Sequence, residues 1–162
     1  MLPDVLQYNL DIVFCGTAAG ETSAKLQMYY AGPGNKFWRT LGEVGLTPRV
    51  LTPREFPDLP KHGLGLTDLV KDASGMDNEI DFRTKGSKAF RDKIIKFQPK
   101  VLCFNGKRAA QEFLSRSVHY GVQPEQIGNT RLFVAPSTSG AANRFWDIKW
   151  WEELARQAHQ DS

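Results

Sequence analysis

Four short stretches rich in small, hydroxyl or charged residues each follow an apolar run, at residues 16–24, 67–72, 105–108 and 136–144. In open α/β sheets, ligands collect beside loops that leave the carboxyl ends of strands, because backbone N–H groups are unpaired there. The first stretch opens a loop of small residues that is typical of ligand binding. We therefore expect the binding and catalytic residues on these four stretches.

The four stretches lack the motifs of several common enzyme classes. Residues 16–20 do not contain the three-glycine dinucleotide pattern, and residues 136–144 do not end in the Gly-Lys-Ser/Thr of a nucleoside-triphosphate loop. No Gly-x-Ser-x-Gly elbow is present and no histidine follows these strands, which disfavours a Ser-His-Asp hydrolase. Taken alone, residues 136–144 fit either a phosphate-binding nest or a plain flexible loop.

The composition predicts one soluble, intracellular (cytoplasmic) domain over residues 1–162. A chain of 162 residues with 41% hydrophobic content can bury a full core, and it has neither an eighteen-residue apolar run nor a secretory leader. Cys15 and Cys103 lie in apolar runs and are expected to be buried thiols. The cysteines and histidines have no recognised ligand spacing, so we expect no metal.

The chain does not carry a general excess of positive charge. The net charge is only +3, with 21 basic against 18 acidic side chains, so a polyanion must meet a local patch. Residues 83–100 are basic, but Phe90, Ile94 and Phe97 recur there at helical spacing, which favours a solvated helix face. Lys107 and Arg108 follow a strand and a glycine, so they are better placed to meet a phosphate.

The elements that must position these residues alternate along the chain. Helical patterns lie between buried strand-like runs, which indicates an α/β/α sandwich around a small, mainly parallel sheet. Residues 72–81 are polar enough for a mobile loop. The expected strands are residues 11–16, 63–69, 101–105 and 131–135, and the expected helices are residues 35–44, 53–60, 87–97, 108–115 and 146–158.

Five segments of the sequence resemble the motifs of the uracil-DNA glycosylase superfamily, in the family's order and spacing. Within the superfamily they are most similar to the branch of mismatch-specific uracil-DNA glycosylases and thymine-DNA glycosylases. The resemblance implies an α/β three-layer α/β/α sandwich with a central four-stranded mainly parallel sheet. The segments are residues 13–24, 33–38, 65–70, 106–107 and 136–140.

The activity that this resemblance implies is hydrolysis of the N-glycosidic bond of uracil in DNA, and of related deaminated or alkylated bases. The base must first be flipped out of the duplex. We expect a monofunctional enzyme without metal or cofactor, because no lysine at the pocket edge resembles a Schiff-base nucleophile. The implied partner is DNA, double-stranded and also single-stranded. We expect the protein to act as a monomer, without a membrane partner.

The family's base pocket falls on residues of the first two segments. Tyr30 stands where the family places an aromatic ring against the flipped base, although a core or rim tyrosine is the plainer alternative. Backbone N–H groups near Gly16, Thr17 and Tyr30 could stabilise the departing base. The expected pocket residues are Gly16, Thr17, Ala18, Ser23, Tyr30 and Asn35.

The first motif departs from the family at its catalytic position. Relatives carry asparagine or aspartate where this chain has Ala18, and a methyl group cannot position the attacking water. Asp68 follows a strand beside the pocket and could orient water or stabilise the sugar cation, although aspartate is also common in turns and caps there. Glu21 is the second catalytic candidate. Alternatively, its charge could simply stabilise the amino terminus of a nearby helix.

The expected DNA contacts lie on the last two stretches. Relatives insert a bulky wedge from this region, whereas small alanines follow Gly140, so we expect relaxed dependence on the opposite base. Trp146 and Trp150 recur at helical spacing within an aromatic cluster, which favours core over base stacking. The expected DNA-binding residues are Lys107, Arg108, Ser137, Ser139, Gly140, Ala141, Asn143 and Arg144.

Two other functions fit the same sequence. A catalytically impaired damaged-DNA binding protein would keep the pocket but lose hydrolysis through Ala18. An unrelated small-molecule α/β enzyme is the weakest alternative, and it would show neither base release nor preference for damaged DNA.

Overall fold

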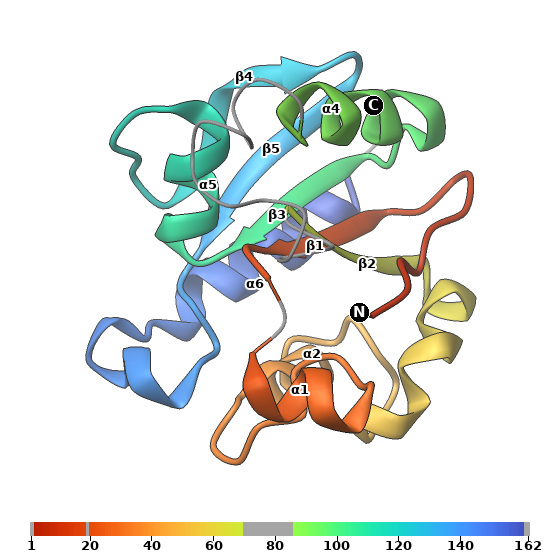
Figure 1. Cartoon of the computed structure of the whole chain (residues 1–162), viewed down its shortest axis with the longest axis vertical. Coiled ribbons are helices and arrows are strands. Elements are labelled where there is room, and N and C mark those ends of the chain that lie inside the picture. The colour runs from red at the N-terminus through yellow and green to blue at the C-terminus, as the bar shows by residue number, and fades with distance from the viewer. Residues whose placement is uncertain (1, 19, 70–85, 161–162) are drawn as a thin grey trace.

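The computed structural model of the chain describes residues 2–18, 20–69 and 86–160. Five strands form one sheet at the centre of the molecule, with helices packed around it (Figure 1). The predicted loop at residues 72–81 lies outside the described residues. The strands are β1 (Ile12–Gly16), β2 (Leu64–Asp68), β3 (Val101–Asn105), β4 (Gly121–Ile127) and β5 (Thr130–Ala135).

Four of the five strands run parallel, in the order β2-β1-β3-β5-β4. The α/β class and the mainly parallel sheet are therefore confirmed, but the predicted count of four strands is wrong. The strand that was missed, β4, pairs antiparallel with β5 at the edge of the sheet. Its exposed Val122 and its Pro124 hide the strand in the sequence, because an edge strand tolerates proline and leaves one face in water.

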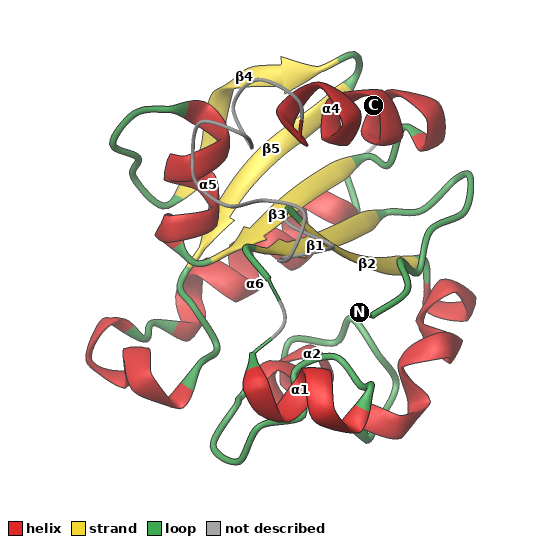
Figure 2. Cartoon of the chain, in the orientation of Figure 1, coloured by secondary structure: helices red, strands yellow, loops and turns green. Residues whose placement is uncertain are grey.

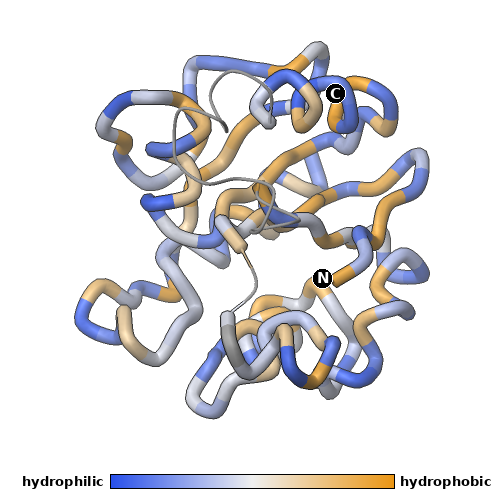
Figure 3. Tube along the Cα trace, in the orientation of Figure 1, coloured by the Kyte–Doolittle hydropathy of each residue, from blue (hydrophilic) through white to orange (hydrophobic). Residues whose placement is uncertain are grey.

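The two faces of the sheet carry two separate hydrophobic clusters. Alternate residues of β1 point to opposite faces, so Phe14 joins one cluster and Val13 the other. Helices α4 (Ser87–Phe97) and α5 (Lys107–Leu114) cover the Val13 face, whereas α2 (Phe37–Glu43), the 3₁₀ helix η1 (Pro53–His62) and α6 (Ile148–Ala158) cover the Phe14 face (Figure 2). Hydrophobic residues accordingly follow the central strands (Figure 3).

The helix boundaries differ from the sequence prediction where capping decides them. The last helix begins at Ile148 rather than near Trp146, because the Asp147 side chain accepts a hydrogen bond from the Lys149 backbone N–H and caps it. Two short helices were not predicted, α1 (Glu21–Leu26) and the 3₁₀ helix η4 (Gly140–Phe145), since their small polar sequences carry no apolar period. No helix among the described residues is long and apolar enough to cross a bilayer.

Aromatic rings fill the core on the Phe14 face. Phe14 stacks on Trp151 with centroids 5.7 Å apart and meets Phe37 edge-on at 5.1 Å, and all three are fully buried. Trp146 and Trp150 are only partly buried against this cluster, so the fully buried tryptophan of α6 is Trp151. The Trp151 indole donates a hydrogen bond to the Pro136 carbonyl at 3.0 Å, which ties the core to the loop after β5.

We expect Phe14→Ala to lower the free energy of unfolding by about 3–5 kcal/mol, because a fully buried ring leaves a cavity that its aromatic neighbours cannot fill. Equilibrium urea unfolding measures the change. The matched control is Ile95→Ala, since Ile95 is 52% exposed on α4 and should change stability by less than about 0.5 kcal/mol. Equal effects of the two substitutions would contradict this account of the core.

Candidate functional site

A cavity of about 760 Å³ opens at the edge of the sheet where the parallel strands end. Loops that follow β1, β3 and β5 supply most of its walls, together with the loop after α1. The residues lining it are Gly16, Thr17, Ala18, Gly20, Thr22, Ser23, Tyr30, Gly32, Pro33, Asn35, Asn105, Gly106, Lys107, Arg108, Ala109, Tyr120, Ser137, Thr138, Ser139, Gly140, Ala141, Ala142 and Phe145.

The cavity brings together most of the residues selected from the sequence. Asp68, Asn143 and Arg144 do not line it, and the side chain of Glu21 lies outside the described part of the structure. The selected residues that line it are Gly16, Thr17, Ala18, Ser23, Tyr30, Asn35, Lys107, Arg108, Ser137, Ser139, Gly140 and Ala141.

Tyr30 is one of the aromatic residues that line the cavity. Its backbone is left-handed, with φ of 52°, which is uncommon for a residue with a bulky side chain and fixes the direction of the ring. Phe37 packs against the ring with centroids 4.2 Å apart. The Ser23 hydroxyl accepts a hydrogen bond from the Ala31 N–H at 2.9 Å, so α1 holds the loop that carries the ring.

The Tyr30 hydroxyl is buried and has no hydrogen-bond partner among the described residues. Burial, and next the Asp68 carboxylate, raise the pKa of this phenol well above its usual value. Asn105 offsets a part of the rise, although its amide makes no hydrogen bond to Tyr30 Oη. The phenol therefore stays neutral, and its buried oxygen stands beside a negative charge.

Asp68 lies beside Gly16, on the neighbouring strand. The two residues are register partners of β1 and β2, and Asp68 is 5% exposed. A Cβ atom on Gly16 would stand 3.2 Å from Asp68 Oδ1 and 3.6 Å from Tyr30 Oη. The absence of a side chain at Gly16 is therefore what lets the carboxylate and the phenol approach the floor of the cavity.

The end of β2 is held from the other face of the sheet. Thr67 Oγ1 donates a hydrogen bond to Asp4 Oδ1 at 2.7 Å, and Lys93 Nζ pairs with Asp4 Oδ2 at 2.8 Å. Because side chains alternate along a strand, this network fixes Thr67 on one face and orients Asp68 toward the other. The position of the buried carboxylate is thus set by α4 and the amino-terminal segment.

Asn105 lines the cavity and opens one of the four selected stretches, residues 105–108, although it was not itself chosen as a site residue. It ends β3, and its side chain makes two hydrogen bonds with Thr138, from Nδ2 to Thr138 Oγ1 and to Oδ1 from the Thr138 N–H, both 3.0 Å. The adjoining Gly106 has φ of +109° and approaches Ser137 so closely that a Cβ atom would be 3.1 Å away. The only signal in the sequence was a polar residue closing an apolar strand.

A second contact closes the cavity between the loop before α2 and the loop after β5. The Lys36 N–H donates to the Thr138 carbonyl at 2.9 Å, and Lys36 Nζ donates to Asn143 Oδ1. Gly34 and Gly140 also meet across this seam, since a Cβ on Gly140 would be 3.4 Å from the Gly34 carbonyl oxygen. Asn143, selected from the sequence as a DNA contact, therefore bridges two loops instead of lining the cavity.

Asn35 presents an amide to the cavity from the same loop. Its Oδ1 accepts a hydrogen bond from the Phe37 N–H at 3.0 Å, which fixes the side chain at the start of α2. No described residue accepts a hydrogen bond from its Nδ2, so this N–H₂ group is available to a ligand. A fixed amide donor of this kind can read a carbonyl group.

Two further aromatic residues, Tyr120 and Phe145, line the cavity. Phe145 is 59% exposed on η4, with the Arg144 guanidinium 5.1 Å from its ring centroid. The expectation of core packing concerned Trp146 and Trp150, which are partly buried, whereas Phe145 is exposed. Tyr120 precedes the unpredicted strand β4, so it was not selected from the sequence.

No group of three or more His, Cys, Asp or Glu side chains is arranged to hold a metal ion within residues 2–18, 20–69 and 86–160. Cys15 and Cys103 are buried free thiols. Burial raises the pKa of the Cys103 thiol.

Fold and site together describe an α/β protein with a cavity at the carboxyl edge of a mainly parallel sheet. The chain belongs to the uracil DNA glycosylase superfamily, whose family model matches residues 3–157. The superfamily predicted from the five motif segments is therefore confirmed.

The chain is also similar to a protein from Methanosarcina acetivorans whose solution NMR structure is described, provisionally, as that of a uracil DNA glycosylase. The two sequences are 26% identical, and the structures agree with a TM-score of 0.65. The similarity covers 98% of this chain and 95% of that chain, so it extends over nearly the whole of both.

We expect Asn105→Ala to lower the free energy of unfolding by about 1–3 kcal/mol, because it leaves the buried Thr138 N–H without its acceptor. Urea unfolding measures this cost. The control is Asn129→Ala, an exposed asparagine in the turn before β5, which should change stability by less than about 0.5 kcal/mol. An Asn105→Ala variant as stable as the parent would show that Asn105 does not hold the two loops together.

Proposed function

We propose that the protein is a monofunctional DNA glycosylase that hydrolyses the N-glycosidic bond of uracil in DNA, and of related damaged bases. We further assign it to the branch of mismatch-specific and thymine-DNA glycosylases. The observation that carries this proposal is the cavity of a superfamily member in which Tyr30, Asn35 and the floor at Gly16 face the same space.

The part of the cavity lined by Tyr30 and Asn35 suits a flat base rotated out of DNA. Tyr30 offers a ring whose direction is fixed by its own backbone and by Phe37, so it can stack on the base without reorganisation. The Asn35 amide can donate a hydrogen bond to a base carbonyl. Extrusion costs a few kcal/mol, least for mispaired or unpaired bases, and these contacts oppose that cost.

Leaving-group stabilisation does not require the side chain that the first motif lacks. Bond cleavage leaves negative charge on the base, and backbone N–H donors aimed at its oxygen favour the transition state. Among the described residues, none accepts a hydrogen bond from the backbone N–H of Thr17 or Ala18, and both residues line the cavity. These donors would survive the replacement of asparagine by Ala18.

Asp68 supplies the electrostatic partner of the cationic sugar in this proposal. Its carboxylate lies next to Gly16 on the neighbouring strand and does not line the cavity. Electrostatic stabilisation of the sugar past Gly16, which has no side chain, therefore fits better than direct contact of Asp68 with a water molecule. A buried carboxylate interacts strongly with a nearby positive charge, because little water intervenes to screen it. Its negative charge already influences the buried phenol of Tyr30.

A second function is favoured by one specific observation. Ala18 is exposed at the cavity, so this position carries no polar group that could hold the attacking water. A protein with this pocket and no hydrolysis would act as a damaged-DNA binding protein. Turnover separates the two functions.

We expect release of uracil from an end-labelled oligonucleotide carrying one U opposite G, and from the same strand alone. Strand cleavage should appear only after alkali, because a monofunctional enzyme leaves an intact abasic site. Addition of EDTA should leave the rate unchanged, since the proposed mechanism uses no metal. Absence of cleavage together with retention of the uracil strand in a gel shift would support the binding protein instead.

We expect Asp68→Asn to lower kcat for uracil release by about two orders of magnitude, because the loss of the buried charge acts on the transition state. KM should change little, since Asp68 does not line the cavity. Single-turnover kinetics on the U·G oligonucleotide measure the change.

The matched control for this substitution is Asp92→Asn. Asp92 lies on α4, its side chain is 62% exposed and it pairs with Lys88 away from the cavity. Both variants should give the circular dichroism spectrum of the parent. If Asp68→Asn cleaves as fast as the parent, Asp68 has no catalytic role.

A further inference from the structure

The first residues of the chain hold β2, the edge strand that ends at Asp68. The Val5 N–H donates a hydrogen bond to the Leu66 carbonyl at 2.8 Å, and the Leu66 N–H donates to the Val5 carbonyl at 2.9 Å. Leu2 is buried in the aromatic core cluster. Residues 2–5, which we call the amino-terminal strap, therefore cover the outer edge of β2 close to its end.

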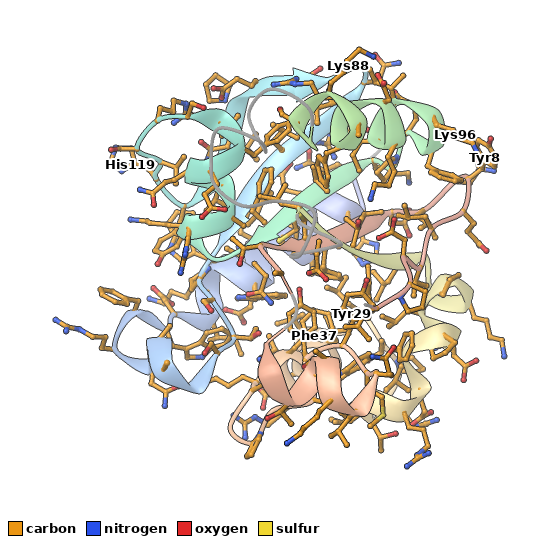
Figure 4. All side chains as sticks on the ribbon, viewed as in Figure 1. Tyr8, Tyr29, Phe37, Lys88, Lys96 and His119 are labelled. Carbon is orange, nitrogen blue, oxygen red and sulfur yellow. The ribbon has the colours of Figure 1, made fainter. Side chains whose placement is uncertain are left out.

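A charged network on one face of β2 ties the strap to α4. The Thr67 hydroxyl donates to Asp4 Oδ1 at 2.7 Å and accepts a hydrogen bond from Lys93 Nζ at 3.2 Å. Lys93 Nζ also pairs with Asp4 Oδ2 at 2.8 Å, and Thr67 is fully buried. The Lys93 side chain is only 23% exposed, so it does not belong to the solvated helix face predicted from the sequence. Lys88 does belong to that face, since it projects from the periphery of the molecule (Figure 4).

On the opposite face of β2 the strap holds the tyrosine that precedes the Tyr30 ring. The Tyr29 hydroxyl donates to the Pro3 carbonyl at 2.9 Å, and the rings of Tyr29 and Tyr30 lie 6.1 Å apart between centroids. Tyr29 lies in the interior of the molecule (Figure 4). Burial, and next the Asp68 carboxylate, raise the pKa of its phenol. The strap therefore contacts both the strand that carries Asp68 and a tyrosine that its charge reaches.

The location of these contacts gives them an effect on the Asp68 carboxylate. Because side chains alternate along a strand, any rotation of the end of β2 moves Thr67 and Asp68 together. The ends of an element open more easily than its centre. A functional group must be held within about 0.5 Å of its working position, and a misplacement of about 1 Å can cost about a hundredfold in rate.

We propose that Asp4 is a positioning residue for the Asp68 carboxylate. Through its contacts with Thr67 and Lys93 it fixes the end of β2, and so the direction of the next side chain. The inference rests on the proposed function in so far as Asp68 acts on the reaction. Neither Asp4, Thr67 nor Lys93 lines the cavity, so their loss should slow the reaction without weakening DNA binding.

The test compares Thr67→Val with Thr67→Ser in single turnovers of the U·G oligonucleotide, with enzyme in saturating excess. Valine keeps the volume of threonine but lacks the hydroxyl that contacts Asp4, whereas serine keeps the hydroxyl and loses a methyl group. Thr67→Val should lower the rate constant about tenfold, and Thr67→Ser should change it by less than about twofold. Packing alone predicts the reverse order, because serine leaves the larger void. Equal rates, or the reverse order, would overturn the proposal.

Asp4→Ala removes the acceptor itself and should slow the reaction at least as much as Thr67→Val. At saturating enzyme the rate constant does not depend on the folded fraction, so a loss of stability alone leaves it unchanged. The matched control is Asp11→Ala. Asp11 Oδ1 lies 3.2 Å from Lys100 Nζ, just before β1 and at the edge of the sheet opposite the cavity. A control slowed as much as Asp4→Ala would mean that any lost ion pair suffices, which overturns the positioning role.

A double-mutant cycle shows whether Asp4 acts through Asp68. In the Asp68→Asn background, Asp4→Ala should slow the reaction little further, because the charge that it positions is already absent. Multiplicative losses in the double variant would overturn the positioning role.

Amide hydrogen exchange, followed by NMR, tests the same network without substrate. The Leu69 N–H donates to the Gly16 carbonyl at 2.9 Å, directly after the end of β2. Thr67→Val should speed exchange of this amide about tenfold and leave that of Leu102 in β3 unchanged, whereas Thr67→Ser should alter neither.

The two measurements separate this inference from the proposed function. A parent protein that releases no uracil, together with the local change in exchange, would contradict the glycosylase and leave the network intact. A parent protein that releases uracil, with unchanged exchange at Leu69 or an unchanged rate in Thr67→Val, would contradict the positioning role alone.

Discussion

Parallel pairing of β2, β1, β3 and β5 is the constraint on which the site depends. Each connection between parallel strands returns to the edge where the next strand starts, so every strand delivers its last residue to the opposite edge. Gly16, Asp68, Asn105 and Ala135 come together in this way, although more than a hundred residues of sequence separate the first from the last. The antiparallel edge strand β4 adds Tyr120 to the same edge because it begins where the other strands end.

Gly16 is the point where the sheet and the cavity meet. Its missing side chain lets the Asp68 carboxylate and the Tyr30 hydroxyl approach the floor, and the fixed loop around Ser23 keeps the Tyr30 ring in place. A buried phenol that finds no hydrogen-bond partner in the described part of the chain, and that lies close to a buried carboxylate, costs stability. Such a cost is typical of functional sites, where the surrounding fold holds groups in energetically unfavourable positions.

The proposed mechanism divides the chemistry between backbone and side chains, and Ala18 alters only a side chain. Backbone N–H groups at Thr17 and Ala18 depend on the turn after β1, which the sheet fixes whatever their side chains are. Ala18 itself offers no polar side chain to the cavity. In the proposed mechanism Asp68, beside Gly16 on the neighbouring strand, provides the electrostatic stabilisation of the cationic sugar.

The sequence by itself determined the class of fold, the four parallel strands and the superfamily, because buried strands and closely spaced motifs leave local signals. It also selected Tyr30, whose ring lines the cavity. Only the tertiary structure decided that Asn105 pairs with Thr138 and that Tyr120 holds Lys107, since these contacts join segments that are distant in the sequence. An edge strand with alternating polar residues and a proline has no clear strand pattern in the sequence. Only the tertiary structure therefore identified β4 and the residues that it positions.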